Sequence, residues 1–432
     1  MKRTQVRRVV VGCALACGAQ AALAADETNE EAIRPAAEAV PNPSSVVQGN
    51  VFEAGGVPVA AGRSPRALRI TDGIDLYAGA TFLAGHDSNV NQAPGGRRAG
   101  SSFFRLRPTV TAESRYRADR YALAYKGDFA EYPDYDPNSV AQNDLIFSAQ
   151  NNFTGRAALA WEASVGDHYD PVGSTDRNLA GDEADHYRTW AAGGTFRYGA
   201  EQARGRLEFD AGTGAKRYRN NRAWTEGADV DNLNLGARFF YRVAPKTRAL
   251  VEYRRTRYEY VNDINHLDNT DSRALLGLSW DATAAITGAL KAGQQYKDYR
   301  HEDTHPDYSG LTWEASVRWR PRTYSRFDLV TGRSASDPTG GIGVPITRNV
   351  SLAWKHDWSA AWHSSFTAQR QRTHFNGGGR KDTENVLRAG VMYDLRRWLG
   401  VGLEYTYARR ASNVDDFDYV RRIATFRAEA TF

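Results

Sequence analysis

A strict two-residue alternation of apolar and polar side chains constrains this chain more than any other feature. It runs from near Gly73 to the last residue. In the final segment, 423–432, Phe426, Ala428 and Phe432 fall on one face of an extended chain, and the residues between them are mostly polar. A helix would need a period of 3.6 residues, which this pattern lacks. The alternation is typical of β-strands with one apolar and one polar face.

The alternating segments are joined by connections whose lengths alternate as well. Clear segments occur at 159–165, 207–211, 233–242, 311–319 and 401–407. Short turns are expected at Asn152–Gly155, Gly199–Ala203, Ala244–Thr247, Asp281–Ala284, Pro321–Thr323, Trp358–Ala361 and Arg396–Leu399. Longer loops are expected near 85–99, 131–140, 168–184, 218–231, 261–271, 298–309, 334–346 and 374–383.

These patterns predict an all-β fold, a transmembrane up-and-down antiparallel β-barrel of the bacterial outer membrane. Eighteen strands can be counted, with sixteen as the alternative. Barrels of this kind have short periplasmic turns and longer extracellular loops, and their strands alternate between a lipid-facing and a lumen-facing side. The tryptophans expected at the lipid interface are Trp161, Trp190, Trp280, Trp313, Trp354, Trp362 and Trp398.

The amino-terminal residues predict an export signal. Four basic residues precede an apolar stretch, and Ala22-Leu23-Ala24 offers a cleavage site, so 1–24 is expected to be a signal peptide. A lipoprotein site at Cys13 is the alternative, but too few apolar residues precede that cysteine. Both cysteines, Cys13 and Cys17, lie in this segment, so the processed chain is expected to contain no disulfide.

Two further regions are expected after the signal. Residues 25–70 are rich in Ala, Pro, Glu and Ser, which predicts a periplasmic linker that cannot bury a core of its own. This linker could insert into the lumen as a plug or dock a partner. The barrel is expected over 71–432.

The net charge excludes a globally basic nucleic-acid-binding protein. The chain has 56 Lys and Arg against 51 Asp and Glu, and the signal segment contains four of the basic residues and none of the acidic ones. The remaining 52 basic and 51 acidic residues nearly balance, so no nucleic-acid partner is expected.

Charge is nevertheless sorted along the strand pattern. The predicted outer loops are acidic, whereas the predicted lumen positions contain more basic than acidic residues. Such a wall would lower the energy of an anion passing through the lumen. The alternative is that these charges pair across strands and only keep the lumen wet. The candidate residues of the substrate path are Arg105, Arg107, Arg206, Arg238, Arg242, Arg254, Arg273 and Arg318.

No motif predicts catalysis, a metal or a cofactor. His301-Glu302-Asp303-Thr304-His305 matches the zinc-protease pattern, but that chemistry requires a helix, and this stretch is followed at once by Pro306 in a predicted loop. His363 and Ser365 share a strand face and are interpreted as polar lining of the lumen. We therefore expect no enzyme, no catalytic residue, no metal and no cofactor.

Two stretches resemble a known family. They are Gly85-His86-Asp87-Ser88-Asn89-Val90 and the ending Leu403–Asn413 followed by Phe417–Arg422. Both resemble type 2 β-barrel porins that are encoded with exopolysaccharide-synthesis genes. The resemblance covers roughly 70–432 and implies an outer-membrane barrel that serves export of an extracellular or capsular polysaccharide.

The functional expectation is therefore a non-enzymatic conduit that assists export of a polysaccharide, most simply an anionic one, through a basic lumen. A general diffusion porin for small hydrophilic solutes and a non-conducting assembly or docking barrel are the alternatives. Expected partners are outer-membrane lipid and lipopolysaccharide, the polysaccharide, periplasmic export components, and the barrel assembly machinery, which would bind the carboxyl-terminal strand ending at Phe432.

Overall fold

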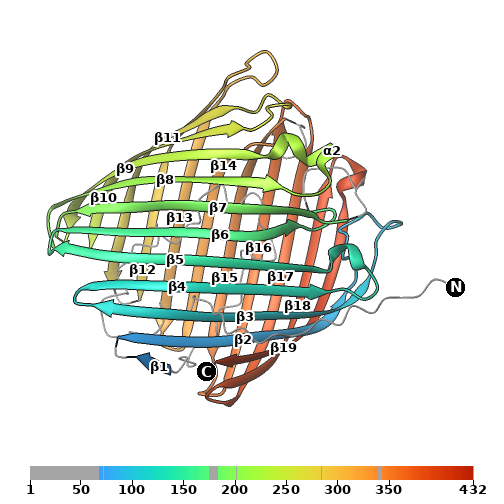
Figure 1. Cartoon of the computed structure of the whole chain (residues 1–432), viewed down its shortest axis with the longest axis horizontal. Coiled ribbons are helices and arrows are strands. Elements are labelled where there is room, and N and C mark those ends of the chain that lie inside the picture. The colour runs from blue at the N-terminus through green and yellow to red at the C-terminus, as the bar shows by residue number, and fades with distance from the viewer. Residues whose placement is uncertain are drawn as a thin grey trace.

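The molecule is a closed β-barrel (Figure 1). The computed structural model describes residues 68–71, 73–174, 183–200, 202–283, 285–338 and 343–431. The predicted signal 1–24, most of the predicted linker 25–70, and Phe432 lie outside the described residues. The three described residues of the linker belong to a short strand, β1 (Leu68–Thr71).

Eighteen long antiparallel strands form the barrel wall. They are β2 (Ile74–Asp87), β3 (Ser101–Tyr116), β4 (Asp119–Glu131), β5 (Val140–Thr154), β6 (Ala157–Asp170), β7 (Asp185–Tyr198), β8 (Gly205–Tyr218), β9 (Val230–Ala244), β10 (Thr247–Tyr260), β11 (Asn269–Thr283), β12 (Ile286–Tyr299), β13 (Tyr308–Arg322), β14 (Ser325–Ala335), β15 (Val344–Asp357), β16 (Trp362–Asn376), β17 (Lys381–Arg396), β18 (Leu399–Ser412) and β19 (Tyr419–Thr431).

The ring closes because the last strand pairs with the first strand of the wall. β19 is antiparallel to β2, in a register that runs from Ile423 opposite Asp87 to Thr431 opposite Gly79. The predicted number of eighteen strands is confirmed, and the alternative of sixteen is wrong. β1 pairs with residues 74–76 of β2 and so covers the part of that strand's edge that β19 does not reach.

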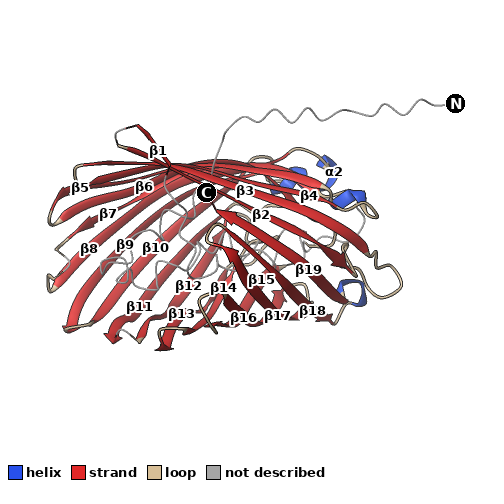
Figure 2. Cartoon of the chain, turned by 90° about the horizontal axis from the view of Figure 1, so that it is seen from below, coloured by secondary structure: helices blue, strands red, loops and turns tan. Residues whose placement is uncertain are grey.

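The two ends of the barrel differ, as the sequence predicted. Short turns gather at one end, and longer connections gather at the other, where the short helical segments lie (Figures 1 and 2). These segments are α2 (Arg222–Thr225) and the 3-10 turns Asp136–Asn138, Glu226–Ala228 and Asp415–Phe417. No helix in the described part of the chain has the length and apolar character to cross a membrane.

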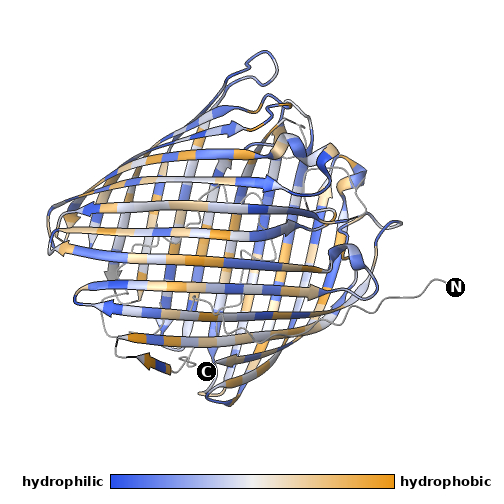
Figure 3. Cartoon of the chain, in the orientation of Figure 1, coloured by the Kyte–Doolittle hydropathy of each residue, from blue (hydrophilic) through white to orange (hydrophobic). Residues whose placement is uncertain are grey.

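Each strand presents alternating side chains to lipid and to the lumen (Figure 3). On β9, Leu233, Leu235 and Phe239 are exposed on the outer face. Phe240, which breaks the sequence alternation, points inward and is buried beneath the guanidinium of Arg206, whose carbon lies 4.5 Å from the ring centroid. The break therefore marks an apolar contact inside the lumen.

Aromatic side chains gather on the outer face near the short turns. The rings of Trp319 and Phe327 stack at 5.2 Å between centroids, and those of Phe327 and Trp354 stack at 6.1 Å. Trp362 and Tyr393 pack at 4.8 Å on neighbouring strands. Amphipathic aromatic rings favour the boundary between hydrocarbon and headgroups, so this belt marks one edge of the membrane.

Three aspartates of the long loops cap the ends of strands. In three hairpins, the aspartate that precedes the second strand accepts a hydrogen bond from the backbone N–H of the tyrosine that ends the first strand, at 2.6–2.8 Å. The pairs are Tyr218 and Asp229, Tyr260 and Asp268, and Tyr299 and Asp307. The carboxylates accept hydrogen bonds from backbone N–H groups that the β-ladder does not pair, and a buried N–H without a partner is costly.

The Asp-Ser-Asn-Val stretch fastens the first long loop at the seam of the ring. The Asn89 amide donates to the carbonyls of Ala93 at 2.8 Å and Val420 at 3.0 Å, and its oxygen accepts from the Ala93 N–H. Asp87 forms a buried ion pair with Arg421 of β19. These residues connect β2, β19 and the loop between β2 and β3.

Replacement of Asn89 by Ala should destabilise the barrel by about 1–3 kcal/mol, because buried backbone groups lose their partners. Urea unfolding in detergent, followed by tryptophan fluorescence, measures this. Asn376→Ala is the matched control, because that exposed side chain makes no hydrogen bond to the described residues. Equal unfolding midpoints for the two variants would contradict the role of Asn89.

Candidate functional site

The lumen wall is the candidate functional site, and all eight predicted arginines lie on it. Each occupies the strand face opposite the exposed aliphatic side chains. They do not form one continuous patch. The structure distributes them over separate clusters, and every one except Arg242 forms an ion pair with a carboxylate of the described residues. Arg242 donates instead to Gln202, next to the turn between β7 and β8.

Near the long-loop end, Arg105 and Arg107 of β3 share one carboxylate. The Nε atoms of Arg105 and Arg107 lie 2.5 Å and 3.0 Å from the oxygens of Asp128 on β4. Arg107 is the more exposed of the two side chains, at 31%. Among the described residues, these two guanidinium groups therefore meet at a single carboxylate.

A second cluster in which two arginines meet at one carboxylate lies near the short-turn end of β13 and β14. Arg318 and Arg326 contact Asp328 at 2.7 Å and 2.8 Å, and Lys355 lies opposite Arg326 in the register of β14 and β15. In the ring of eighteen strands, β4 and β14 are ten strands apart in one direction and eight in the other. The two cationic sites therefore lie on nearly opposite walls and at opposite ends of the lumen.

Arg206 and Arg238 are balanced by acids. Arg206 contacts Glu208 at 3.0 Å, and Arg238 lies 3.3 Å from Glu208 and 2.7 Å from Asp210. Arg206 is 8% exposed, so it packs on the wall more than it faces solvent. These charges fit the alternative that inward charges pair across strands.

A four-membered network crosses β10 to β13. Arg254 donates to both oxygens of Glu314 at 2.8 Å and also pairs with Glu252. Lys291 of β12 lies 3.1 Å from Glu252 on β10 and 2.6 Å from Glu314 on β13. Lys291 and Glu252 are each 2% exposed, so each charge depends on its partners.

Gly277 allows Lys291 to reach across the intervening strand. It lies on β11 directly opposite Lys291, and a Cβ there would be 2.8 Å from the Cγ of Lys291 and 2.4 Å from the Leu290 carbonyl oxygen. Sequence reasoning did not identify Gly277 or Lys291 as a pair. The only signal was a glycine in the middle of an alternating strand.

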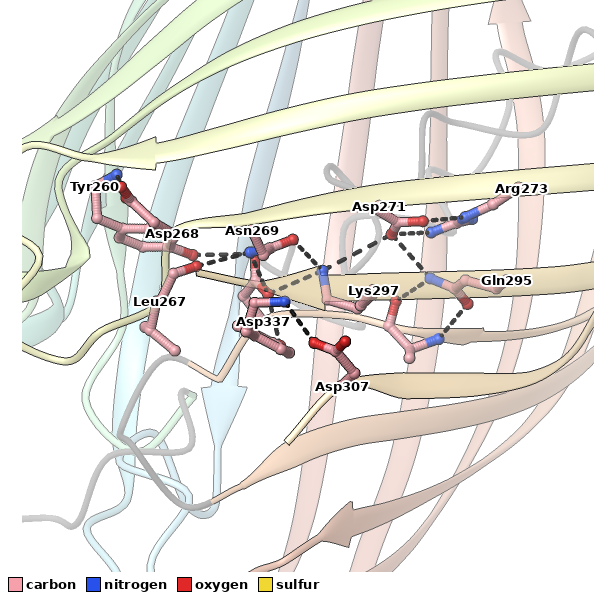
Figure 4. Close-up of polar contacts among 12 residues, drawn as sticks. Tyr260, Leu267, Asp268, Asn269, Asp271, Arg273, Gln295, Lys297, Asp307 and Asp337 are labelled. Carbon is pink, nitrogen blue, oxygen red and sulfur yellow. Dashed lines mark hydrogen bonds and ion pairs between the residues drawn. The ribbon is translucent and has the colours of Figure 1, made fainter. Parts of the chain in front are cut away.

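Arg273 belongs to a network that fastens a long loop inside the mouth (Figure 4). It contacts Asp271 at 3.0 Å, and Asp271 accepts from Gln295 at 2.8 Å. The Gln295 amide also donates to the Ala335 carbonyl at the end of β14, two strands away, and accepts from the Ala335 N–H. Arg273 is 7% exposed, so it contributes to this support more than to the open lumen.

Asp337 anchors the loop between β14 and β15 against the lumen face of β10 to β12. Its carboxylate lies 2.9 Å from the fully buried Lys297, and it accepts hydrogen bonds from the hydroxyls of Tyr260 and Tyr299 at 3.1 Å and from Asn269 at 3.0 Å. The described start of this loop, up to Asp337, therefore lies against the inner wall at the mouth (Figure 4).

Loops on the opposite side fold inward as well. The Asn138 amide donates to the Val90 carbonyl at 2.9 Å, and its oxygen accepts from the Val172 N–H at 3.0 Å, which joins three long loops. Lumen-facing Arg410 of β18 donates to the Gly173 carbonyl at 3.3 Å. β18 and β6 are separated by five strands, so the loop after β6 reaches across part of the mouth.

The described residues contain one group whose ligand atoms could hold a metal ion. The donor atoms of Asp263, His266 and His301 lie within 4.8 Å of one another, on two neighbouring long loops. Two imidazoles and a carboxylate suit zinc or a similar transition metal. His305 turns instead to the Asn265 carbonyl at 2.9 Å, so the two histidines of the H-E-x-x-H motif do not share a site.

His363 is not placed as a general base. Its Nδ1 lies 2.7 Å from Asp357, and its Nε2 lies 3.1 Å from Asp394, so carboxylates occupy both ring nitrogens. Ser365 lies opposite Lys355 and Gly390 in the sheet. These contacts agree with the interpretation of His363 as polar lining.

Asp337→Asn should widen the mouth, because the buried Lys297 loses its closest counterion and the loop loses its anchor. We expect a larger single-channel conductance and a loss of stability of roughly 3 kcal/mol. Planar-bilayer recordings and urea unfolding measure the two effects. Asp303→Asn, in an exposed loop position, is the control. An unchanged conductance for Asp337→Asn would show that this loop does not narrow the path.

Gly277→Ala should cost about 1–3 kcal/mol, since the added methyl overlaps the opposite strand and the stem of Lys291. Gly155→Ala serves as the matched control, because a Cβ at this turn position meets open space. Chemical unfolding of both variants in the same detergent tests the difference. Equal stability would mean that Gly277 is not needed for the crossing.

Comparison with known proteins gives a family. The chain matches the family described as "Putative beta-barrel porin 2" over residues 76–430, which is most of its length. No curated protein sequence matches the chain.

Among solved structures, the barrel is similar to a BenF-like porin from Pseudomonas fluorescens Pf-5. The two share 10% identity with a TM-score of 0.49 over 84% of this chain and 100% of that one. It is also similar to OccK2 (OpdF) of Pseudomonas aeruginosa, at 12% identity and a TM-score of 0.48, over 83% and 98% of the two chains. At such low similarity, these structures carry no argument about function.

The family consists of porins rather than enzymes, and its match covers every strand of the wall but the ends of the first and last. The chain belongs to the family of β-barrel porin 2 and is a multi-pass β-barrel of the bacterial outer membrane.

Proposed function

We propose that this porin-like barrel conducts an anionic hydrophilic polymer, an extracellular or capsular polysaccharide, across the outer membrane. The observation that carries the proposal is the pair of cationic sites around Asp128 and Asp328. In each site, two arginines share one carboxylate. The sites lie at opposite ends of the lumen, so an anion would meet one after entry and the other before exit.

Weak, separated sites suit conduction better than one tight site. A polymer that binds strongly at one point is held there, whereas several replaceable contacts let it advance. Arg107 and Arg318 are 31% and 44% exposed, so they can exchange partners with a passing anion. The resemblance of the 85–90 stretch to barrels encoded with exopolysaccharide-synthesis genes supports a polysaccharide as the solute.

A general diffusion porin for small hydrophilic solutes is the second candidate. The inward-folded loops anchored by Asp337 and Asn138 favour it, because a narrowed mouth admits small molecules without rearrangement. Polymer export would require at least one of these loops to move.

Ion selectivity tests the cationic sites. In planar bilayers under a KCl gradient, the wild-type barrel should prefer chloride, and the double variant Arg107→Gln, Arg326→Gln should lose much of this preference. Asp128→Asn should increase it, because that change adds net positive charge. Cation selectivity that the double variant leaves unchanged would contradict the proposal, and negligible conductance would favour a docking barrel.

Deletion of the gene tests whether the conducted solute is a secreted polysaccharide. If the barrel exports a polysaccharide, the amount of secreted polymer should fall in the deletion strain and recover when the wild-type gene is restored. Restoration with the double variant should give only partial recovery. Unchanged secretion together with steady conductance would instead favour the diffusion porin.

A further inference from the structure

The outer face of the barrel has an arginine-rich sector near the long loops. On β14 to β19, six arginines lie on the same strand face as the exposed Val350, Leu352 and Phe366. This outer arginine patch consists of Arg333, Arg348, Arg370, Arg372, Arg409 and Arg422. All except the half-buried Arg333 are exposed.

The sheet register places these like charges side by side. Arg333 of β14 lies directly opposite Arg348 of β15, and Arg348 lies directly opposite Arg372 of β16. Directly opposed side chains have Cβ atoms about 5 Å apart, and like charges in this position are destabilising. Arg370 and Arg409 flank the same Asn385 in the next row.

None of these six arginines forms an ion pair with a carboxylate in the described part of the chain. The outward-facing described residues of β14 to β19 include no aspartate or glutamate. Two outward arginines elsewhere on the barrel have acidic partners. Arg217 lies 2.7 Å from Asp231, and Arg257 lies 2.5 Å from Glu259. The contrast indicates that the patch takes its counter-charge from outside the chain.

The position of the patch identifies the membrane layer that it faces. Arg348 is followed on the same face of β15 by Val350, Leu352 and Trp354 toward the short turns. The arginines therefore lie just above the apolar band, on the side of the long loops, where the headgroups of the outer leaflet lie. In Figure 1 these strands form one continuous part of the wall.

We propose that the outer arginine patch binds the phosphate groups of a lipopolysaccharide molecule in the outer leaflet. The planar guanidinium donates paired hydrogen bonds that match phosphate oxygens, and one phosphate can bridge adjacent arginines. A bound phosphate turns the repulsion between Arg333, Arg348 and Arg372 into a shared attraction. The proposal depends on the membrane location of the barrel and not on what passes through its lumen.

The binding experiment uses the full-length barrel in neutral detergent and two probes, lipopolysaccharide and the same lipopolysaccharide after phosphate removal. Wild-type protein should bind the phosphorylated form at least about tenfold more tightly. The variant Arg348→Gln, Arg370→Gln, Arg372→Gln should lose that difference. The variant Arg217→Gln, Arg257→Gln removes outward arginines from the acid-paired sector and should retain it. Inorganic phosphate at the same concentration should not compete.

A stability measurement distinguishes a loss of binding from misfolding of a variant. Arg348→Gln should raise the melting temperature in neutral detergent, because it removes the middle charge of the row, and should reduce the rise that added lipopolysaccharide gives to wild type. A heat-modifiable gel shift confirms that each variant is folded. Equal binding of both probes by wild type, or equal loss of binding in both multiple variants, would overturn the proposal. Competition by free phosphate would do the same, because it indicates a small-anion site.

Discussion

Closure of the hydrogen-bonded ring is the constraint on which the rest of this structure depends. An open strand edge cannot be satisfied in hydrocarbon, so a β-structure that spans the membrane must pair its last strand with its first. Here β19 pairs with β2, and β1 covers the remaining edge. Asn89 and the ion pair between Asp87 and Arg421 hold the first long loop against this seam. Once the ring is closed, every strand has one face toward lipid and one toward water.

The lumen face follows from the cost of leaving charges unpaired. Lys291, Glu252 and Glu314 are nearly inaccessible, so each is held against an opposite charge on another strand. Most inward arginines therefore support the wall. Selectivity can arise where two arginines meet at one carboxylate, around Asp128 and Asp328. We expect the width of the path to depend on the loop residues held at the mouth, such as Asp337 and Asn138.

Unpaired charges are costly on the outer face as well, but there some arginines are not paired within the chain. On β8 and β10, the outward Arg217 and Arg257 pair with acids of the chain. On β14 to β16, three arginines are adjacent in register and form no ion pair with a described carboxylate. A soluble protein would be destabilised by such a row. In an outer membrane the environment itself supplies anions at this depth, so the row becomes a binding surface.

The sequence by itself determined the class of fold and the inward orientation of the eight arginines, because a two-residue period and the turn positions are local properties of the chain. It predicted eighteen strands but left sixteen open, and closure of the ring decided for eighteen. It also predicted acidic loops, and three of their aspartates, Asp229, Asp268 and Asp307, cap strand ends. Only the tertiary structure decided which charges meet. Arg254 and Glu314 are 60 residues apart in the sequence. Asp337 contacts Lys297 of β12 from the loop that follows β14, two strands along the ring. Such contacts depend on the stagger and curvature of the closed ring, which no local pattern specifies. They decide which arginines only support the wall and which can face a passing anion.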